Sequence, residues 1–196
     1  MINKIIISLL IISFFSLLSC DEAYTPKPRG YFRIDLPQKN YLLFDSVFPY
    51  AFEYPNYAII DTNLQLNDQK YWMNLQMPQF KATLHFSYKK VDNNLGEYLE
   101  DAHTLVTKLI PKADGIYDSL IVDRKRNVFG LSYRVVGSGA ASPYQFFLTD
   151  SSSHFVRAAL YFNTIPNNDS LQPVIDFIES DINHIIETFE WEKPIR

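Results

Sequence analysis

Two stretches of the chain place apolar residues at the spacing of an amphipathic helix. In the stretch 95–110 the apolar stripe consists of Leu95, Tyr98, Leu99, Ala102, Leu105, Val106 and Leu109. In the stretch 171–189 it consists of Leu171, Val174, Ile175, Ile178, Ile182, Ile185, Ile186 and Phe189. The pattern predicts two helices, each with one buried face. Asn93 or Asn94 can cap the first helix and Pro111 ends it, while Pro173 is tolerated in the first turn of the second.

Between and before these helices, apolar and polar residues alternate with the period of half-buried strands. In the run 80–91, Ala82, Leu84, Phe86 and Tyr88 share one face, and Thr83, His85 and Ser87 share the other. The alternation and the turn residues between runs predict strands at 50–54, 57–60, 71–77, 80–91, 116–122, 128–136, 144–148 and 155–163.

The order of strands, helix, strands and helix predicts an α+β fold with a mainly antiparallel sheet flanked by two amphipathic helices. An early "FEYP" strand, a mid-chain helix, a run of strands and a closing helix near "TFEW" (188–191) also resemble the Mog1/PsbP type of α/β/α sandwich. That resemblance implies a sandwich in which helices cover both faces of the sheet.

The first apolar run, Ile5–Leu18, follows a short segment with one positive charge and has the anatomy of a signal peptide. Its length of about 14 residues gives a helix of ~21 Å, which is too short for a ~30 Å hydrocarbon core. Leu17, Ser19 and Cys20 resemble the lipobox of bacterial lipoproteins, in which the cysteine carries the lipid and cleavage falls just before it. The alternative is an ordinary signal peptide that ends near a chance cysteine, although Cys20 is the only cysteine of the chain.

These features divide the chain into a lipoprotein signal peptide (1–19), a lipidated arm or tether (20–40) and one α+β domain (41–196). Prolines stiffen the arm toward an extended form. Its aromatic content leaves two readings open, namely packing on its own domain or docking to a partner. The candidate docking residues are Tyr24, Pro26, Pro28, Arg29, Tyr31 and Phe32.

Composition narrows the function classes. Without residues 1–19 the chain keeps 17 Lys+Arg against 22 Asp+Glu, a side-chain net charge of −5. An acidic chain of this kind argues against nucleic-acid binding and against a polybasic membrane patch. No second apolar stretch is long enough to cross a bilayer, so we expect membrane attachment only through a lipid on Cys20.

No catalytic or metal-binding constellation is visible in the sequence. His85, His103, His154 and His184 have no ligand spacing, so neither a metal nor another cofactor is expected. The helical pattern places His184 on the solvent side of the last helix. The segment 137–143 contains Gly-Ser-Gly but no G-x-S-x-G, and a strand follows it, which indicates a loop. Glu97, Glu100 and Asp101 belong to the solvated face of the first helix.

Cys20, the block "YTPKPRGYFRIDLP" at 24–37, "PYAFEYP" at 49–55 and "FKATLH" at 80–85 together resemble the gliding motility lipoprotein GldD family of Bacteroidetes-type bacteria. The resemblance covers essentially the whole mature chain. It implies an envelope lipoprotein required for surface gliding, a process tied to type IX secretion. At residue level it carries over one role, Cys20 as the lipid attachment site.

The leading hypothesis is therefore a non-enzymatic, lipid-anchored structural or assembly component on the periplasmic side of the inner or outer membrane. Its partners are expected to be the membrane and other gliding or secretion proteins, with no nucleic acid and no metal. The alternative is an envelope enzyme or glycan-binding module that uses a cleft not visible in the sequence. A pocket with convergent polar groups favours the alternative, and a flat apolar patch favours the leading hypothesis.

Overall fold

The computed structural model describes residues 30, 33–62 and 70–191. The described residues from Arg33 onward belong to one compact unit. The predictions for 1–19, for Cys20 and for the arm residues Tyr24, Pro26, Pro28, Arg29, Tyr31 and Phe32 lie outside the described residues, so they stay predictions, as do the domain boundaries. In the described part of the chain, no helix is long and apolar enough to cross a membrane.

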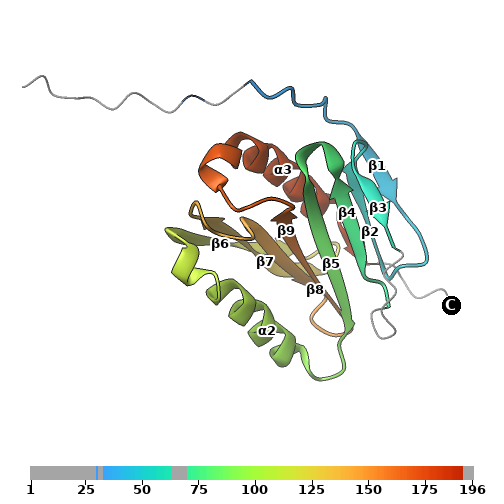
Figure 1. Cartoon of the computed structure of the whole chain (residues 1–196). Coiled ribbons are helices and arrows are strands. Elements are labelled where there is room, and N and C mark those ends of the chain that lie inside the picture. Colours follow the sequence, from blue (N-terminus) through green and yellow to red (C-terminus); the bar gives the residue numbers. More distant parts are fainter. Residues whose placement is uncertain (1–29, 31–32, 63–69, 192–196) are drawn as a thin grey trace, which may run out of the picture. The chain divides into compact units, whose positions relative to one another are not determined.

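The strands form two antiparallel sheets (Figure 1). The small sheet has the order β1-β2-β10, with β1 (Tyr41–Phe44), β2 (Tyr50–Pro55) and β10 (Glu190–Trp191). The large sheet has seven strands in the order β3-β4-β5-β9-β8-β7-β6. Its strands are β3 (Ile59–Asp61), β4 (Met73–Met77), β5 (Ala82–Lys90), β6 (Gly115–Asp123), β7 (Val128–Val136), β8 (Tyr144–Thr149) and β9 (His154–Phe162).

Two α-helices cover opposite faces of the large sheet, as Figure 1 shows. Helix α3 (Asn168–Thr188) shares one core with the small sheet and with the inward residues of β4, β5, β8 and β9. Helix α2 (Leu95–Thr107) packs on the other face through a smaller cluster with β7, β8 and β9. Two short 3-10 turns, η2 (Pro78–Phe80) and η3 (Ile110–Lys112), complete the described elements. The predicted α+β fold with an antiparallel sheet between two amphipathic helices is confirmed.

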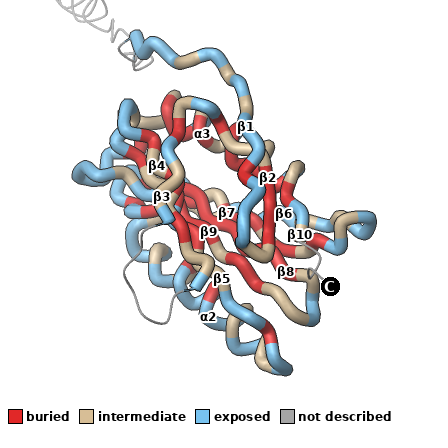
Figure 2. Tube along the Cα trace, turned by 90° about the vertical axis from the view of Figure 1, so that its right-hand side faces the viewer, coloured by how far each residue is buried: buried red, intermediate tan, exposed pale blue. Residues whose placement is uncertain are grey.

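The main core is built from aromatic rings that join the two sheets and α3. The ring of Phe52 on β2 stacks on Phe86 of β5, with 5.3 Å between centroids, and on Phe189 just after α3, at 6.2 Å. Tyr50 stacks on Phe189 at 5.6 Å. All four rings are buried, and Figure 2 shows the buried residues along the middle strands of the large sheet. Such pairs are stabilised by ring contact in addition to the apolar area that they bury.

Seven of the eight predicted strands, β2 and β4–β9, are confirmed nearly in their full extent. Alternation works because one face of each strand enters the core while the other faces α2 or solvent. The structure adds β1 and β10, which the sequence analysis did not predict, and it places β3 later, at Ile59–Asp61. These three strands are two to four residues long and carry too few residues for a periodic signal.

The helix ends differ from the predicted ones. Helix α2 ends at Thr107, and Pro111 lies in the separate turn η3. Helix α3 begins at Asn168, so Pro173 lies inside the helix beyond its first turn, which corrects the predicted start. Asn94 occupies the N-cap position of α2, but its side chain makes no cap bond. Its amide group instead accepts from the Asp92 N–H and donates to the Tyr98 hydroxyl, each at 2.9 Å.

Two residue-level predictions are wrong. Leu105, assigned to the buried stripe of the first helix, is 40% exposed, because α2 sits over β7–β9 and its flank at Leu105 faces open space. His184, assigned to the solvent side of the last helix, is half-buried under the small sheet. Its ring stacks on Tyr41 with 3.7 Å between centroids.

Candidate functional site

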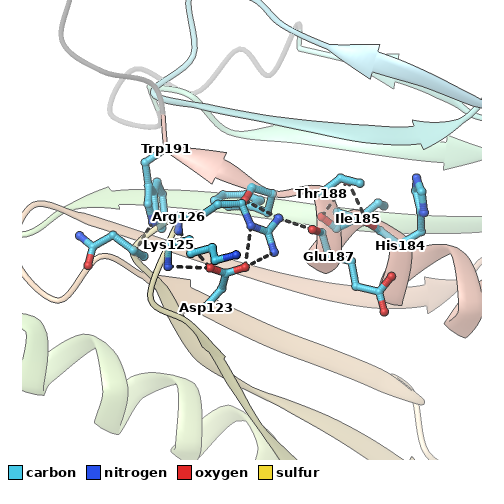
Figure 3. Close-up of polar contacts among 10 residues, drawn as sticks. Asp123, Lys125, Arg126, His184, Ile185, Glu187, Thr188 and Trp191 are labelled. Carbon is cyan, nitrogen blue, oxygen red and sulfur yellow. Dashed lines mark hydrogen bonds and ion pairs between the residues drawn. The ribbon is translucent and has the colours of Figure 1, made fainter.

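One polar cluster of the structure lies at the C-terminal end of α3 (Figure 3). Arg126, in the turn between β6 and β7, donates to the carbonyl oxygens of Glu187 and Phe189. Its guanidinium also lies 2.8 Å from a carboxylate oxygen of Asp123. The backbone N–H of Arg126 and then its side chain hold the pKa of Asp123 below the ordinary value. Because the last carbonyls of a helix lack partners within the helix, this cluster serves as a C-terminal cap.

A second polar cluster surrounds Asp181, in the middle of α3. Its carboxylate has no exposed surface and accepts hydrogen bonds from Lys39 Nζ and the Tyr41 hydroxyl, both at 2.8 Å, and from the Tyr57 hydroxyl. Burial, together with the bond to Asp181, raises the pKa of Tyr41 to about 12. A buried carboxylate is tolerated only when it is paired and hydrogen-bonded in this way. The cluster fixes the beginning of the domain to α3.

His184 belongs to the same region and joins α3 to β2. Its Nε2 lies 2.7 Å from Oε2 of Glu53, and the Glu53 backbone N–H donates to the Thr188 hydroxyl at 3.0 Å. No local pattern in the sequence marks this contact, because Glu53 and His184 are far apart in the chain. Both polar clusters hold elements of the fold together, and none of their residues lines the groove described next.

An open groove of about 470 Å³ lies on the α2 face of the large sheet. Its floor is formed by β4, β5 and β9, and α2 supplies one wall through Tyr98, Asp101, Ala102 and Leu105. The groove exists because α2 packs over β7–β9 and leaves the neighbouring strands without a covering helix. Its volume falls within the roughly 300–1,000 Å³ that is typical of small-molecule pockets.

The strand register arranges the floor of the groove in rows. Asn74, His85 and Ala159 are paired neighbours across β4, β5 and β9, and in the next row Ser87 pairs with Arg157. The residues Ser87 and Ala159 are small, which deepens the floor between the larger side chains. The alternation of β5 predicted this polar face, but the sequence does not show that α2 leaves it open.

Two titratable groups of the floor have shifted pKa values. Nδ1 of His85 lies 2.6 Å from Oδ1 of Asn74. Burial lowers the pKa of His85, so its imidazole is neutral near pH 7. Burial also lowers the pKa of Arg157, which remains a cation because arginine does not deprotonate in proteins. The floor thus combines a neutral imidazole with a guanidinium.

Comparison with known proteins identifies the family. The family profile described as "Gliding motility lipoprotein GldD" matches residues 21–191. The chain belongs to this family. Membership in the GldD family implies involvement in gliding motility and indicates a lipid-anchored envelope protein. No curated protein matches the chain.

Among solved structures, the solution structure of cyanobacterial PsbP (CyanoP) from Synechocystis sp. PCC 6803 is similar to this member of the GldD family. The two share 11% sequence identity with a TM-score of 0.47, over 86% of this chain and all of the other.

The four histidines of this GldD family member do not converge. His85 lines the groove, His103 is exposed on α2, and His184 contacts Glu53. His154 lies 2.8 Å from the Tyr88 hydroxyl and stacks on Trp191. Within the described ranges there is no group of three or more His, Cys, Asp or Glu that could hold a metal ion.

Proposed function

We propose that the protein is a lipid-anchored, non-enzymatic component of the gliding apparatus, held in the membrane by acyl chains on Cys20. The arm that follows Cys20 contacts other proteins of the gliding and type IX secretion machinery. The lipobox-like sequence and the family support the anchor. Two or more acyl chains are needed for stable membrane attachment, which the lipoprotein type of modification provides.

The observation that carries this proposal is the arrangement at the described end of the arm. Lys39 is fixed on α3 by its bond to Asp181, while Ile34 and Leu36 are 36% and 41% exposed. The apolar side chains that precede Lys39 thus keep more than a third of their surface exposed, and the point at which this segment meets α3 is fixed. This supports an arm that presents apolar residues to a partner rather than to its own domain.

The experiment replaces Cys20 with Ala and compares the variant with the natural chain in cells that lack the protein. We expect loss of label from a clickable palmitate analogue together with loss of colony spreading. Leu42→Ala, a substitution at an exposed position of β1, serves as the control and should keep both label and spreading. Equal label on the Cys20→Ala variant, or full spreading by an unlabelled variant, contradicts the proposal.

The groove supports a second candidate, a ligand-binding module. Catalysis is less well supported, because among the described residues no hydrogen bond joins a nucleophile to His85, whose ring nitrogen contacts Asn74. A groove of this volume with a fixed cation on its floor supports binding without chemistry. A binding role is compatible with the anchor and with a partner on the arm.

A further inference from the structure

The groove lining is mainly apolar, yet it contains one arginine in the floor. Trp72, Tyr98, Leu105 and Tyr161 are among the residues that surround the space, and Arg157 lies in the floor on β9. Apolar walls around a few fixed polar groups are typical of pockets for small organic ligands.

Arg157 has no carboxylate partner among the described residues. Its guanidinium donates to Oε1 of Gln145 and hydrogen-bonds the Tyr161 hydroxyl, and neither partner is a carboxylate. By contrast, Arg33, Arg126 and Arg134 each pair with a carboxylate at 2.7–3.2 Å. A half-buried charge without a counter-ion is costly, and in this respect Arg157 differs from these three arginines.

The remaining charges of the groove do not neutralise Arg157. Lys89 Nζ lies 3.7 Å from Oδ2 of Asp101, and these two side chains are 43% and 69% exposed at the rim. The neutral imidazole of His85 adds no charge. The groove is therefore locally positive in a chain whose overall charge is negative, which favours an anionic ligand.

We propose that the groove binds an organic acid with an apolar body. The carboxylate of the ligand pairs with Arg157, whose fork of donors matches a carboxylate in two parallel hydrogen bonds. The apolar body lies against Tyr98, Leu105 and Trp72 along the wall and rim. Two sources supply this chemistry, a free acid or the C-terminal carboxylate of a polypeptide whose last side chain is apolar.

The test uses fluorescence of Trp72, because the only other tryptophan, Trp191, packs on His154 and Phe189 and does not line the groove. The complete mature chain, with Cys20→Ser to keep it unacylated, is titrated with 3-phenylpropionate and with its neutral amide. We expect a saturable change with the acid and binding of the amide weaker by about tenfold or more. The Trp72→Phe variant should lose the signal.

Two arginine variants locate the binding site. Arg157→Gln should abolish binding of the acid, whereas Arg134→Gln should keep it, since Arg134 pairs with Asp176 and Glu179 of α3 on the opposite face. The comparison of acid and amide uses a chain that keeps Arg157, so it tests the need for a carboxylate even if the Arg157→Gln variant does not fold. Equal binding of acid and amide, no binding of either, or unchanged binding by a folded Arg157→Gln variant overturns the proposal.

A second pair of probes separates the sources of the acid. N-acetylphenylalanine presents the end of a polypeptide, and 3-phenylpropionate presents a free acid of similar size. Tighter binding of either one supports the carboxylate site and identifies its source. If glucuronate, an acid with a polar body, binds more tightly than both probes, the proposal that the ligand has an apolar body is wrong. These outcomes are independent of the lipid anchor, which is tested by cell labelling.

Discussion

Lys39 Nζ lies 2.8 Å from Oδ1 of Asp181, and this pair fixes the start of the domain to the middle of α3. The ammonium group also donates to the carbonyl oxygen of Phe177 at 2.8 Å and lies 4.1 Å from the centre of its ring. Asp181 has no exposed surface, whereas the Lys39 side chain is 30% exposed. The arm therefore meets the domain at a buried, charged contact.

Because of this contact, even a substitution of Asp181 that keeps its size should lower the stability of the fold strongly. Asp181→Asn keeps the size of the side chain but removes the charge that pairs with Lys39. We expect the free energy of unfolding to fall by about 3 kcal/mol, because breaking a buried ion pair leaves a charge without its partner. Urea unfolding of the purified chain measures the change.

The neighbouring exposed pair Arg33–Asp35 provides the control for that experiment. Its N–O distance is 3.2 Å, but both side chains are about nine-tenths exposed, at 91% and 89%. Exposed pairs contribute roughly 0–1 kcal/mol, so Asp35→Asn should leave the unfolding curve nearly unchanged. Equal effects of the two substitutions would show that the Asp181 contact is not the anchoring point.

Three half-buried tyrosines predict a loss of stability in alkali. Burial raises the pKa of Tyr41 and of Tyr88 to about 12, and burial also raises the pKa of Tyr57. The unfolded chain loses these protons near pH 10 while the folded chain keeps them, so the free energy of unfolding should fall from about pH 10 to about pH 12. Tyr57→Phe should flatten this fall, and identical slopes for both chains in urea titrations would contradict the assignment.

Replacement by alanine should have opposite effects on the free energy of unfolding at Gly130 and at Gly96. A Cβ on Gly130 of β7 would lie 1.9 Å from the carbonyl oxygen of Phe147 on β8, so Gly130→Ala should lower the free energy of unfolding by about 3 kcal/mol or more. At Gly96 of α2 nothing lies within 4 Å, and Gly96→Ala should raise it by roughly 0.5–1 kcal/mol. Thermal unfolding of both variants, measured side by side, checks the pair.

An aspartate introduced into the apolar stripe should affect stability differently in α3 and in α2. Ile182 of α3 has no exposed surface, so Ile182→Asp places an unpaired carboxylate in the main core and should unfold the chain. Leu105 of α2 is 40% exposed beside the groove, where Leu105→Asp leaves the charge in water and should cost about 1 kcal/mol or less. Circular dichroism distinguishes the outcomes, and an unfolded Leu105→Asp variant would mean that α2 packs more tightly than its exposure indicates.

Leu105 also shows which features of a helix can be predicted from sequence periodicity and which cannot. The 3.6-residue pattern correctly predicts α2 and its buried Ala102 and Val106. It gives the width of the stripe but not the position of the helix over the sheet, which is set by packing with β7–β9. A residue at the edge of the stripe, such as Leu105, becomes a groove wall for this reason.

The candidate sites depend on contacts that are distant in sequence. The alternation of β5 predicts that His85 and Ser87 share a polar face, but their meeting with Arg157 requires the pairing of β5 with β9. Asp181 lies in a helix whose other buried residues are mostly aliphatic, and no local signal marks it for burial. Its partners Lys39 and Tyr41 come from the other end of the chain. Only the shape of the fold brings such groups together.

The final prediction concerns the arm. Changing Tyr31 and Phe32 together to Ser should abolish colony spreading while lipid label, abundance and melting temperature stay nearly unchanged, if these residues dock to a partner. Ile34 and Leu36, the nearest described apolar residues of the arm, are at least one-third exposed, which supports this outcome. Ile165→Ser, at a position that is 87% exposed before α3, is the matched control and should leave spreading intact.

The alternative for the arm gives a different result in the same measurements. If Tyr31 and Phe32 pack on their own domain, their replacement should lower stability by a few kcal/mol, since each buried aromatic side chain contributes about 1.5–3 kcal/mol. Abundance would then fall together with spreading, and the loss of motility would follow from unfolding. Full spreading by a normally expressed double variant removes docking by these two residues. Lost spreading with an unchanged melting temperature leaves a partner on the arm as the explanation, because neither the anchor nor the fold has changed.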